Sequence, residues 1–305
     1  MLVSPLYAVV LAILLPFAAV AAPASGRRGE TIPTLAASQI QSYTTYTWYA
    51  NAAYCAPSKT LAWECGLSCN ANPAFQPIAA GGDGSDVQFW FVGYDPALDT
   101  VIVSHQGTNP QAILPLLTDA DIVLEQLDAS LFPGVSSSVR VHSGFAREHS
   151  KTATAVLAAV QEAMSTYSVG RVTIVGHSLG AAVALLDAIY LPLHIPDASY
   201  TFVGYGLPRV GNQEFADYVD AHPIAVSHVN NRQDVVPILP GEFLGYVHPA
   251  GELHILNSGA WAACPGQDNS NTECIVGDVP TVFEGDTAYH DGPYYGITMS
   301  SSCSS

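Results

Sequence analysis

Residues 171–190 read "RVTIVGHSLGAAVALLDAIY", two largely apolar runs separated by a turn that carries one serine. The first run, 171–176, is short and rich in β-branched residues, which is typical of a buried central strand. The second run begins at residue 181 and has the length and composition of a helix. Between them "GHSLG" (176–180) fits the pattern G-x-S-x-G, which in a strand–turn–helix context exposes a serine hydroxyl. The alternative is a serine that merely caps a helix between two chance glycines.

This turn makes Ser178 a candidate nucleophile. The flanking glycines suit a turn so tight that its neighbours must be small. Because a helix begins directly afterwards, backbone N–H groups and the positive helix end face the point where an oxyanion develops in acyl transfer. His177 is adjacent to the serine but points in a different direction, so we interpret it as a packing or hydrogen-bonding residue.

Strands and helices alternate around this turn, which predicts one α/β domain with a mostly parallel central sheet flanked by helices. A G-x-S-x-G turn between a strand of such a sheet and a helix is typical of the α/β-hydrolase fold. The segment 56–85 is rich in Cys, Asn, Pro and Gly and is predicted to be a loop. We expect the helix after the turn to end at Pro192. The predicted strands are 87–94, 100–105, 171–176, 200–206 and 224–230, and the other predicted helices are 36–54, 144–167 and 212–222.

The composition limits the classes of partner. The chain has 305 residues, 49% of them hydrophobic, which suits one large domain with a single core. The formal net charge is −17, and the only lysines are Lys59 and Lys151. A basic patch therefore cannot form, which excludes nucleic acid and anionic membranes as partners. We expect a monomer that needs no metal or cofactor.

The start of the chain and its cysteines indicate secretion. Residues 1–22 are apolar and end in small residues, as in a signal peptide, so we expect no integral membrane association. Residues 23–35 form a possible pro-segment or a flexible N-terminus, and 36–305 form the domain. The chain has six cysteines, an even number that suits disulfides outside the cell. Their spacing alone does not select a pairing.

A serine hydroxyl needs a base, and the base needs a carboxylate to orient it. On this fold the chain order is serine, acid, histidine. Asp234 lies just past a predicted strand and is the candidate acid, whereas Asp187 falls inside a helix and is interpreted as structural. His254 alternates within a strand-like run and is predicted to be a sheet residue. His248 and His290 both precede loops that contain Pro and Gly, and spacing does not choose between them.

Together these motifs resemble the fungal class 3 lipases, secreted α/β-hydrolases that also include some feruloyl esterases. The resemblance runs from about Ala36 to Cys303. Five motifs occur in the family's order: "HQGT" (105–108), "VHSGF" (141–145), "VGHSLG" (175–180), "GLPRVGN" (206–212) and "NRQDVVP" (231–237).

The resemblance implies roles for five residues. It implies Ser178 as nucleophile and Asp234 as acid. It favours His290 as the base, because "HDGPYYG" looks like the family's histidine segment. It implies that Thr108 and the backbone N–H of Leu179 stabilise the oxyanion.

The same resemblance implies a disulfide pairing, and comparison with the family also shows one departure in this sequence. The family's disulfides would join Cys55 to Cys303, Cys65 to Cys69 and Cys264 to Cys274. The family's oxyanion loop often reads Phe-Arg-Gly-Thr or Phe-Arg-Gly-Ser. His105 and Gln106 replace the first two residues here, which alters the support of the loop.

The apolar run "AILPLL" (112–117) lies where the family has a lid over the acyl pocket. The alternative is a plain core segment. An apolar lid favours long acyl esters, so we expect an acylglycerol lipase of the triacylglycerol lipase type that acts at an oil–water interface. The alternative functions are a feruloyl or short-chain carboxylesterase and a catalytically silent lipid- or wall-binding protein. The candidate lid residues are Ala112, Ile113, Leu114, Leu116 and Leu117.

Overall fold

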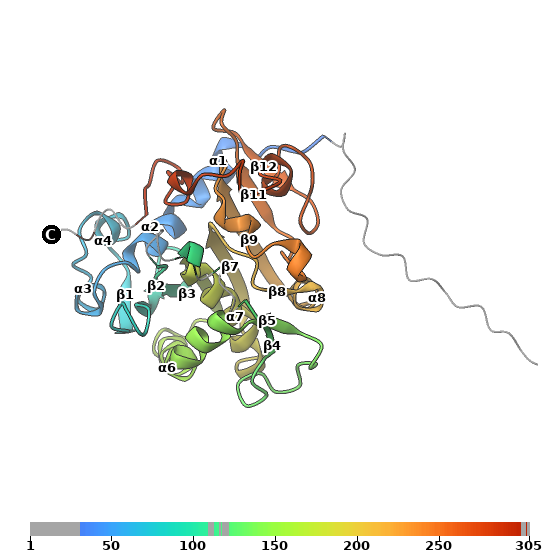
Figure 1. Ribbon diagram of the computed structural model, residues 1–305. Coiled ribbons are helices and arrows are strands. Elements are labelled where there is room, and N and C mark those ends of the chain that lie inside the picture. Colours follow the sequence, from blue (N-terminus) through green and yellow to red (C-terminus); the bar gives the residue numbers. More distant parts are fainter. Residues whose placement is uncertain (1–30, 109–112, 116, 118–121, 300–302, 304–305) are drawn as a thin grey trace, which may run out of the picture.

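The computed structural model describes residues 31–108, 113–115, 117, 122–299 and 303 (Figure 1). Its centre is a sheet in the order β1-β2-β3-β6-β7-β9-β11-β12. The strands from β3 to β11 run parallel, and the outer pairs β1–β2, β2–β3 and β11–β12 are antiparallel. The mostly parallel sheet is therefore confirmed. The strands are β1 Gln76–Gly81, β2 Trp90–Asp95, β3 Thr100–His105, β6 Arg171–His177, β7 Ser199–Tyr205, β9 Ile224–Asn231, β11 Glu252–Ile255 and β12 Trp261–Cys264.

Helices lie on both faces of this sheet (Figure 1). α6 (Ser143–Tyr167) and α7 (Leu179–His194) pack on one face, and α1 (Ala37–Ser42) and α2 (Thr44–Ala52) pack on the other. Within the described part of the chain, no helix is both long enough and apolar enough to cross a bilayer. The shorter helices are α3 Pro57–Ala62, α4 Leu67–Ala71, α8 Gln213–Ala221, α9 Ile275–Asp278, η1 Val236–Ile238, η2 Glu242–Leu244 and η3 Thr287–Tyr289.

A second, antiparallel sheet lies beside the main one, in the order β10-β8-β5-β4. It connects β5, the strand directly before α6, with the segment after β7, because Val141 of β5 pairs with Gly211 of β8. Its strands are β4 Leu124–Gln126, β5 Arg140–His142, β8 Gly211–Asn212 and β10 Tyr246–Val247.

Successive side chains of β6 point to opposite faces of the sheet and are buried in two different hydrophobic clusters. Val172 and Ile174 are buried in the cluster that contains α6 and α7. Val175 is buried in the opposite cluster, with Ala50 of α2 and Val203 of β7. Full burial of one such side chain contributes about 1.5–3 kcal/mol. The central strand is thus held from both sides, which fixes the turn that follows it.

Three local predictions were wrong. The segment 56–85 contains α3, α4 and β1 rather than a single loop. β1 escaped notice because it is an edge strand whose pairing shifts register next to Pro77. The predicted helix 36–54 is divided at Tyr43 into α1 and α2. α7 continues past Pro192 to His194, because a proline so close to the helix end removes only one backbone donor from the last turn.

The described chain is anchored at both ends. Ile32 is buried against Ala262, and Thr34 pairs with Ala262, so the packed region begins before Ala36. The expected signal peptide and residues 23–30 lie outside the described residues. The structure contains the three disulfides that the resemblance implies, Cys55–Cys303, Cys65–Cys69 and Cys264–Cys274.

Candidate active site

The turn between β6 and α7 has the geometry of a nucleophile elbow. Ser178 adopts φ 58° and ψ −129°, a conformation that side chains rarely adopt. Its N–H donates to the carbonyl oxygen of Tyr205 at 2.9 Å. A Cβ at Gly180 would collide with the backbone of His105 and Gln106, so this position requires glycine. The serine is therefore held at the carboxyl end of the central strand by a strained, tightly packed turn.

The structure brings Asp234 and His290 together, although 56 residues separate them. Asp234 Oδ2 lies 2.8 Å from His290 Nδ1, and both side chains are buried. The other carboxylate oxygen accepts the N–H of Val236 at 2.9 Å. Gly206 makes room for the ring, since a Cβ there would lie 2.8 Å from His290 Cε1. Because Nδ1–H donates to the carboxylate, Nε2 remains as a proton acceptor.

His177 connects the segments that carry the serine and the histidine. The ring of His177, next to Ser178, lies 4.6 Å from the ring of His290, measured between centroids. Ser178 Oγ and His290 Nε2 are both buried, and neither has a hydrogen-bond partner among the described residues. Buried polar atoms are normally paired. These two open atoms belong to residues that both adjoin His177, and they indicate a place where a substrate completes the arrangement.

The segment that carries His290 is fixed by three side chains. His177 Nε2–H donates to the carbonyl oxygen of His290 at 2.9 Å, and the Tyr294 hydroxyl donates to the same oxygen at 2.8 Å. The Tyr54 hydroxyl donates to His177 Nδ1 at 2.6 Å. Burial holds the pKa of His177 well below its ordinary value, so the ring is neutral and has one N–H to donate. The hydrogen-bonding role of His177 is confirmed, whereas no sequence signal identified Tyr54 or Tyr294.

The oxyanion candidates come from two segments that meet at the serine. Leu179 is the first residue of α7, and the first N–H groups of a helix have no acceptor within the helix. Thr108 ends the segment that leaves β3 and is half-buried. The preceding Gly107 contacts the elbow directly, since a Cβ there would lie 3.0 Å from Ser178 Cβ.

The other histidines have different surroundings. His248 Nε2 lies 2.7 Å from the carbonyl oxygen of Pro237, and its ring stacks on His228 at 4.9 Å. Burial lowers the pKa of both histidines to about 3. His254 is a buried sheet residue whose Nε2 lies 2.8 Å from the carbonyl oxygen of Arg232. The geometry thus separates His290 from His248, which spacing did not.

The candidate lid residues are only partly described. Ile113 and Leu117 are buried in the same apolar cluster as α7, and Leu114 packs against that cluster. Ala112 and Leu116 lie outside the described residues. This burial fits both a segment that covers the site and a core segment.

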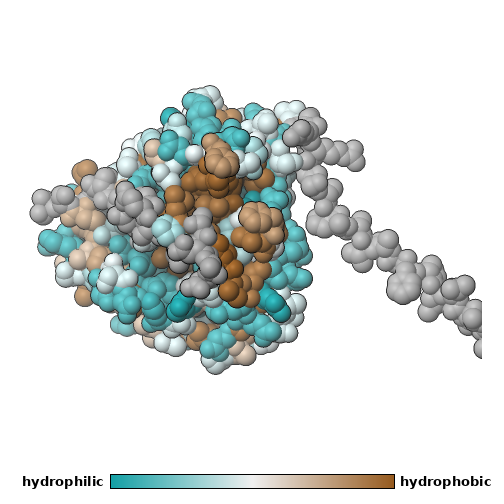
Figure 2. Space-filling view, in the orientation of Figure 1, coloured by the Kyte–Doolittle hydropathy of each residue, from teal (hydrophilic) through white to brown (hydrophobic). Residues whose placement is uncertain are grey.

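An apolar band crosses the face of the molecule shown in Figure 2. Large hydrophobic side chains that are exposed include Phe243, Val282 and Phe283. Phe243 and Val282 also line a cavity of about 650 Å³ together with Ile238 and Leu239, which follow the 231–237 segment that carries Asp234. Arg209 and Glu242 also line this cavity, whereas Ser178, Asp234 and His290 do not.

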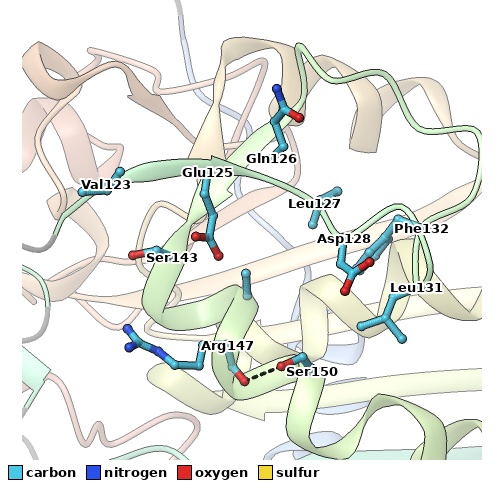
Figure 3. Close-up of a pocket in the computed structure, with 11 residues that line it drawn as sticks. Val123, Glu125, Gln126, Leu127, Asp128, Leu131, Phe132, Ser143, Arg147 and Ser150 are labelled. Carbon is cyan, nitrogen blue, oxygen red and sulfur yellow. Dashed lines mark hydrogen bonds between the residues drawn. The ribbon is translucent and has the colours of Figure 1, made fainter.

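A separate cavity of about 610 Å³ lies between the 123–132 segment and the first turns of α6 (Figure 3). Its lining is mixed and includes the charged side chains of Glu125, Asp128 and Arg147. Neither Ser178, Asp234 nor His290 lines it.

The residues do not suggest a metal site. Among the described residues, one group of three potential ligands lies close enough together, namely Glu252, Cys264 and Cys274. Both cysteines are in the same disulfide, so neither offers a thiolate.

Comparison of the sequence with known proteins finds a matching family. Residues 102–244 match the family model described as Lipase (class 3). A secreted mono- and diacylglycerol lipase of Gibberella zeae is 32% identical over 227 residues, which cover 72% of this chain and 70% of that protein. A protein of the same description from Malassezia restricta is 34% identical over 173 residues, 55% of each chain. The match thus spans about half the length of the Malassezia protein.

Solved structures give the same result. The triacylglyceride lipase of Rhizomucor miehei superposes with a TM-score of 0.76 at 25% identity. The superposition covers 90% of this chain and 100% of that one. The mostly parallel sheet with flanking helices is therefore the α/β-hydrolase fold of the fungal lipases.

Proposed function

The chain belongs to the class 3 lipase family, and on this premise we propose that it is a secreted serine ester hydrolase that cleaves acylglycerols through an acyl-enzyme. One observation carries the proposal. Asp234 and His290 form a buried pair, His177 links the elbow to the His290 segment, and the open atoms are Ser178 Oγ and His290 Nε2. This is the geometry that activates a hydroxyl for attack on an ester carbonyl.

In the first half of the reaction, Ser178 Oγ attacks the ester carbonyl and His290 Nε2 takes the hydroxyl proton. Asp234 holds the ring in the tautomer that leaves Nε2 free, and it stabilises the imidazolium that forms. The N–H groups of Leu179 and Thr108 donate to the developing oxyanion. His290 then gives its proton to the departing alcohol, which leaves the acyl group on Ser178.

In the second half, a water molecule replaces the alcohol. His290 takes a proton from the water, which attacks the acyl carbonyl, and the same donors stabilise the second oxyanion. His290 returns the proton to Ser178 Oγ, and the fatty acid leaves. No group outside the chain is needed for proton transfer.

Two features support acylglycerols as the substrate class. Relatives with matching sequence are named mono- and diacylglycerol lipases, and a structural neighbour is a triacylglyceride lipase. The cavity next to the 231–237 segment offers apolar side chains, among them Phe243 and Val282, against which an acyl chain loses contact with water. The secretion of those relatives supports an extracellular location for this chain.

We also propose that the 112–117 segment is a lid. Ser178 and His290 are both 0% exposed, so a substrate reaches them only if a covering segment moves. Ile113 and Leu117 are buried in the cluster that contains Leu179, next to the nucleophile. In water this closed form is favoured because it hides apolar surface, at about 25 cal/mol per Å². At a lipid surface the open form buries the same side chains in lipid, so the equilibrium shifts.

Hydrolysis of p-nitrophenyl esters from acetate to palmitate, with methyl ferulate alongside, tests the function. The unmodified protein is expected to hydrolyse these acyl esters, and Ser178→Ala to lose about 10⁴-fold or more in kcat with an unchanged circular dichroism spectrum. Assays on mono-, di- and triacylglycerol emulsions then define the acylglycerol.

Three outcomes would contradict parts of the proposal. A Ser178→Ala variant that keeps most of its activity would exclude the serine mechanism. Preference for methyl ferulate would support the feruloyl esterase alternative. An unmodified protein that binds lipid but cleaves no ester would be the silent binding protein.

A further inference from the structure

A second buried carboxylate lies beneath the elbow. Asp187 is in α7, and its Oδ2 lies 2.6 Å from His105 Nε2 while its Oδ1 lies 2.9 Å from His149 Nε2. The three side chains are at most 1% exposed. They come from the end of β3, from α7 and from α6, so one carboxylate joins three elements.

The cluster is closed in the sense that both oxygens of its carboxylate are bonded to a histidine. Burial alone would raise the pKa of Asp187, but the hydrogen bonds from His105 and His149 outweigh it and lower the pKa to about 2. The carboxylate is therefore ionised, with an N–H donor on each oxygen. His149 Nδ1 is buried and has no partner among the described residues, so Nε2 is the nitrogen that carries the ring proton. Phe132 and Tyr190 pack on the ring of His149 and exclude water from it.

The cluster is connected to the oxyanion loop through α7. Gly180 and Asp187 are seven residues apart and so lie on the same face of the helix. Gly180 packs against the backbone of His105 and Gln106, and Asp187 holds the ring of His105. The helix that carries the nucleophile at its first turn thus holds the start of the oxyanion loop at two points, three residues before Thr108.

Gln106 provides a second anchor on the other side of the loop. Its backbone N–H donates to the carbonyl oxygen of Phe89 at 2.8 Å, and its side-chain Oε1 accepts the N–H of Phe89 at 2.9 Å. The two residues that depart from the family's usual loop sequence, His105 and Gln106, are therefore the two that anchor it.

We propose that Asp187, His105 and His149 form a positioning cluster that sets the distance between the oxyanion donor Thr108 and Ser178; the proposal rests on the ester hydrolase function. None of the three touches the reacting atoms. Each acts through the loop backbone, because a histidine ring held at Nε2 leaves the strand end with one position relative to α7. Oxyanion donors act only when they lie within hydrogen-bond distance of the transition state, and a displacement of about 1 Å can cost about 10²-fold in rate.

The experiment compares kcat and KM for a soluble short-chain p-nitrophenyl ester. His105→Phe keeps the ring volume but loses the donor, and it is expected to lower kcat by about 10- to 100-fold with KM within about threefold. His105→Gln offers an N–H to the carboxylate and is expected to recover most of the loss. Asp187→Asn keeps one acceptor oxygen and is expected to lie between the two; it also serves if His105→Phe does not fold.

Asp95→Asn is the matched control. Asp95 is also a buried carboxylate, which accepts the Tyr49 hydroxyl at 2.7 Å and the Ala97 N–H at 2.7 Å. It lies at the end of β2 that pairs with Thr100, at the opposite end of β3 from His105. The kcat of the Asp95→Asn variant is expected to stay within threefold of that of the unmodified protein.

The possible outcomes distinguish a failure of the proposed function from a failure of the positioning role. An unmodified protein without esterase activity would defeat the proposed function, independently of the cluster. With an active unmodified protein, the positioning role would be overturned by a folded His105→Phe variant whose kcat is within threefold of it. Equal losses in His105→Phe and His105→Gln, or an equal loss in Asp95→Asn, would overturn it as well, because they would reflect general destabilisation.

Discussion

Two buried groups of carboxylate and histidine lie on either side of the same elbow, and they differ in which ring nitrogen faces the carboxylate. His290 presents Nδ1 to Asp234, so its Nε2 stays open. His105 and His149 both present Nε2 to Asp187, so in these two rings Nε2 is bonded to the carboxylate. The same chemical groups thus make an open pair suited to proton transfer and a closed cluster suited to holding backbone in place.

The backbone context explains the difference. Asp234 lies just beyond the end of β9, at the edge of the sheet where ligands bind in such folds, and His290 follows η3. Asp187 and His149 lie inside helices that pack on the sheet, so their side chains are enclosed by the core. A carboxylate in that position is retained only with partners on both oxygens.

The largest expected effect tests the open pair. His290→Ala is expected to lower kcat by about 10⁴-fold or more, because no other described histidine contacts Asp234. His248→Ala is the control, since its ring bonds to the backbone of Pro237, and it is expected to keep kcat within tenfold. Steady-state assays on a soluble ester measure both. An inactive His248→Ala variant beside an active His290→Ala variant would reverse the assignment of the base.

The next prediction concerns the free energy of unfolding, which is expected to change differently when each of the two carboxylates is replaced. Asp187→Ala leaves two buried N–H donors without an acceptor and is expected to lower the free energy of unfolding by about 3–5 kcal/mol. Asp234→Asn is expected to lose about 10⁴-fold in kcat while changing stability far less. Urea unfolding with parallel kinetics measures both. Equal stability losses for the two variants would remove the distinction between open and closed groups.

The third prediction concerns the pH dependence of stability. It compares Asp187 of the closed cluster with the neutral pair His228 and His248. The pKa of each of these histidines is about 3 in the folded protein, against 6.5 ordinarily. The unfolded chain therefore binds more protons, so their contribution to stability is full above pH 6.5 and is lost as the pH falls toward 3. Asp187, with a pKa of about 2 against 3.8, loses its contribution only below pH 3.8. Urea midpoints are expected to fall between pH 7 and pH 4. A midpoint that stays constant over that range would contradict the neutral, buried state of the pair.

The smallest effect on the chemistry is expected from a change that touches neither group. Leu114→Asp places a charge on the proposed lid and is expected to spare hydrolysis of a soluble short ester, within about threefold. It is expected to blunt the rise in activity that occurs when a long-chain substrate passes its solubility limit. Rates measured across that limit, with the unmodified protein as reference, test this. Absence of the rise in the unmodified protein would contradict the lid.

The sequence predicted what local patterns encode. The run at 171–176, the elbow and the amphipathic 144–167 segment identified β6, Ser178 and α6 almost to the residue. Asp234, which the structure pairs with His290, was singled out because it follows a predicted strand. These features depend on neighbours in sequence, and so they are visible without a structure.

Features that depend on distant contacts were not predictable in the same way. Asp187 was recognised as structural, but its bonds to His105 and His149 join residues 82 and 38 positions away. Tyr54 has no motif, and its role appears only when α2 lies against the elbow. The choice between His290 and His248 needed either the family pattern or the observed contact with Asp234.

The central claim is that Ser178 is the nucleophile of an ester hydrolase, and labelling with a fluorophosphonate probe followed by peptide mass spectrometry tests it most directly. The probe reacts covalently with a serine hydroxyl only where a base and oxyanion donors activate it. The expected result is one adduct, on the peptide that contains Ser178, formed rapidly by the unmodified protein and by His248→Ala and lost in His290→Ala. An unlabelled Ser178 in the folded, unmodified protein, or an adduct on another serine, would contradict the account.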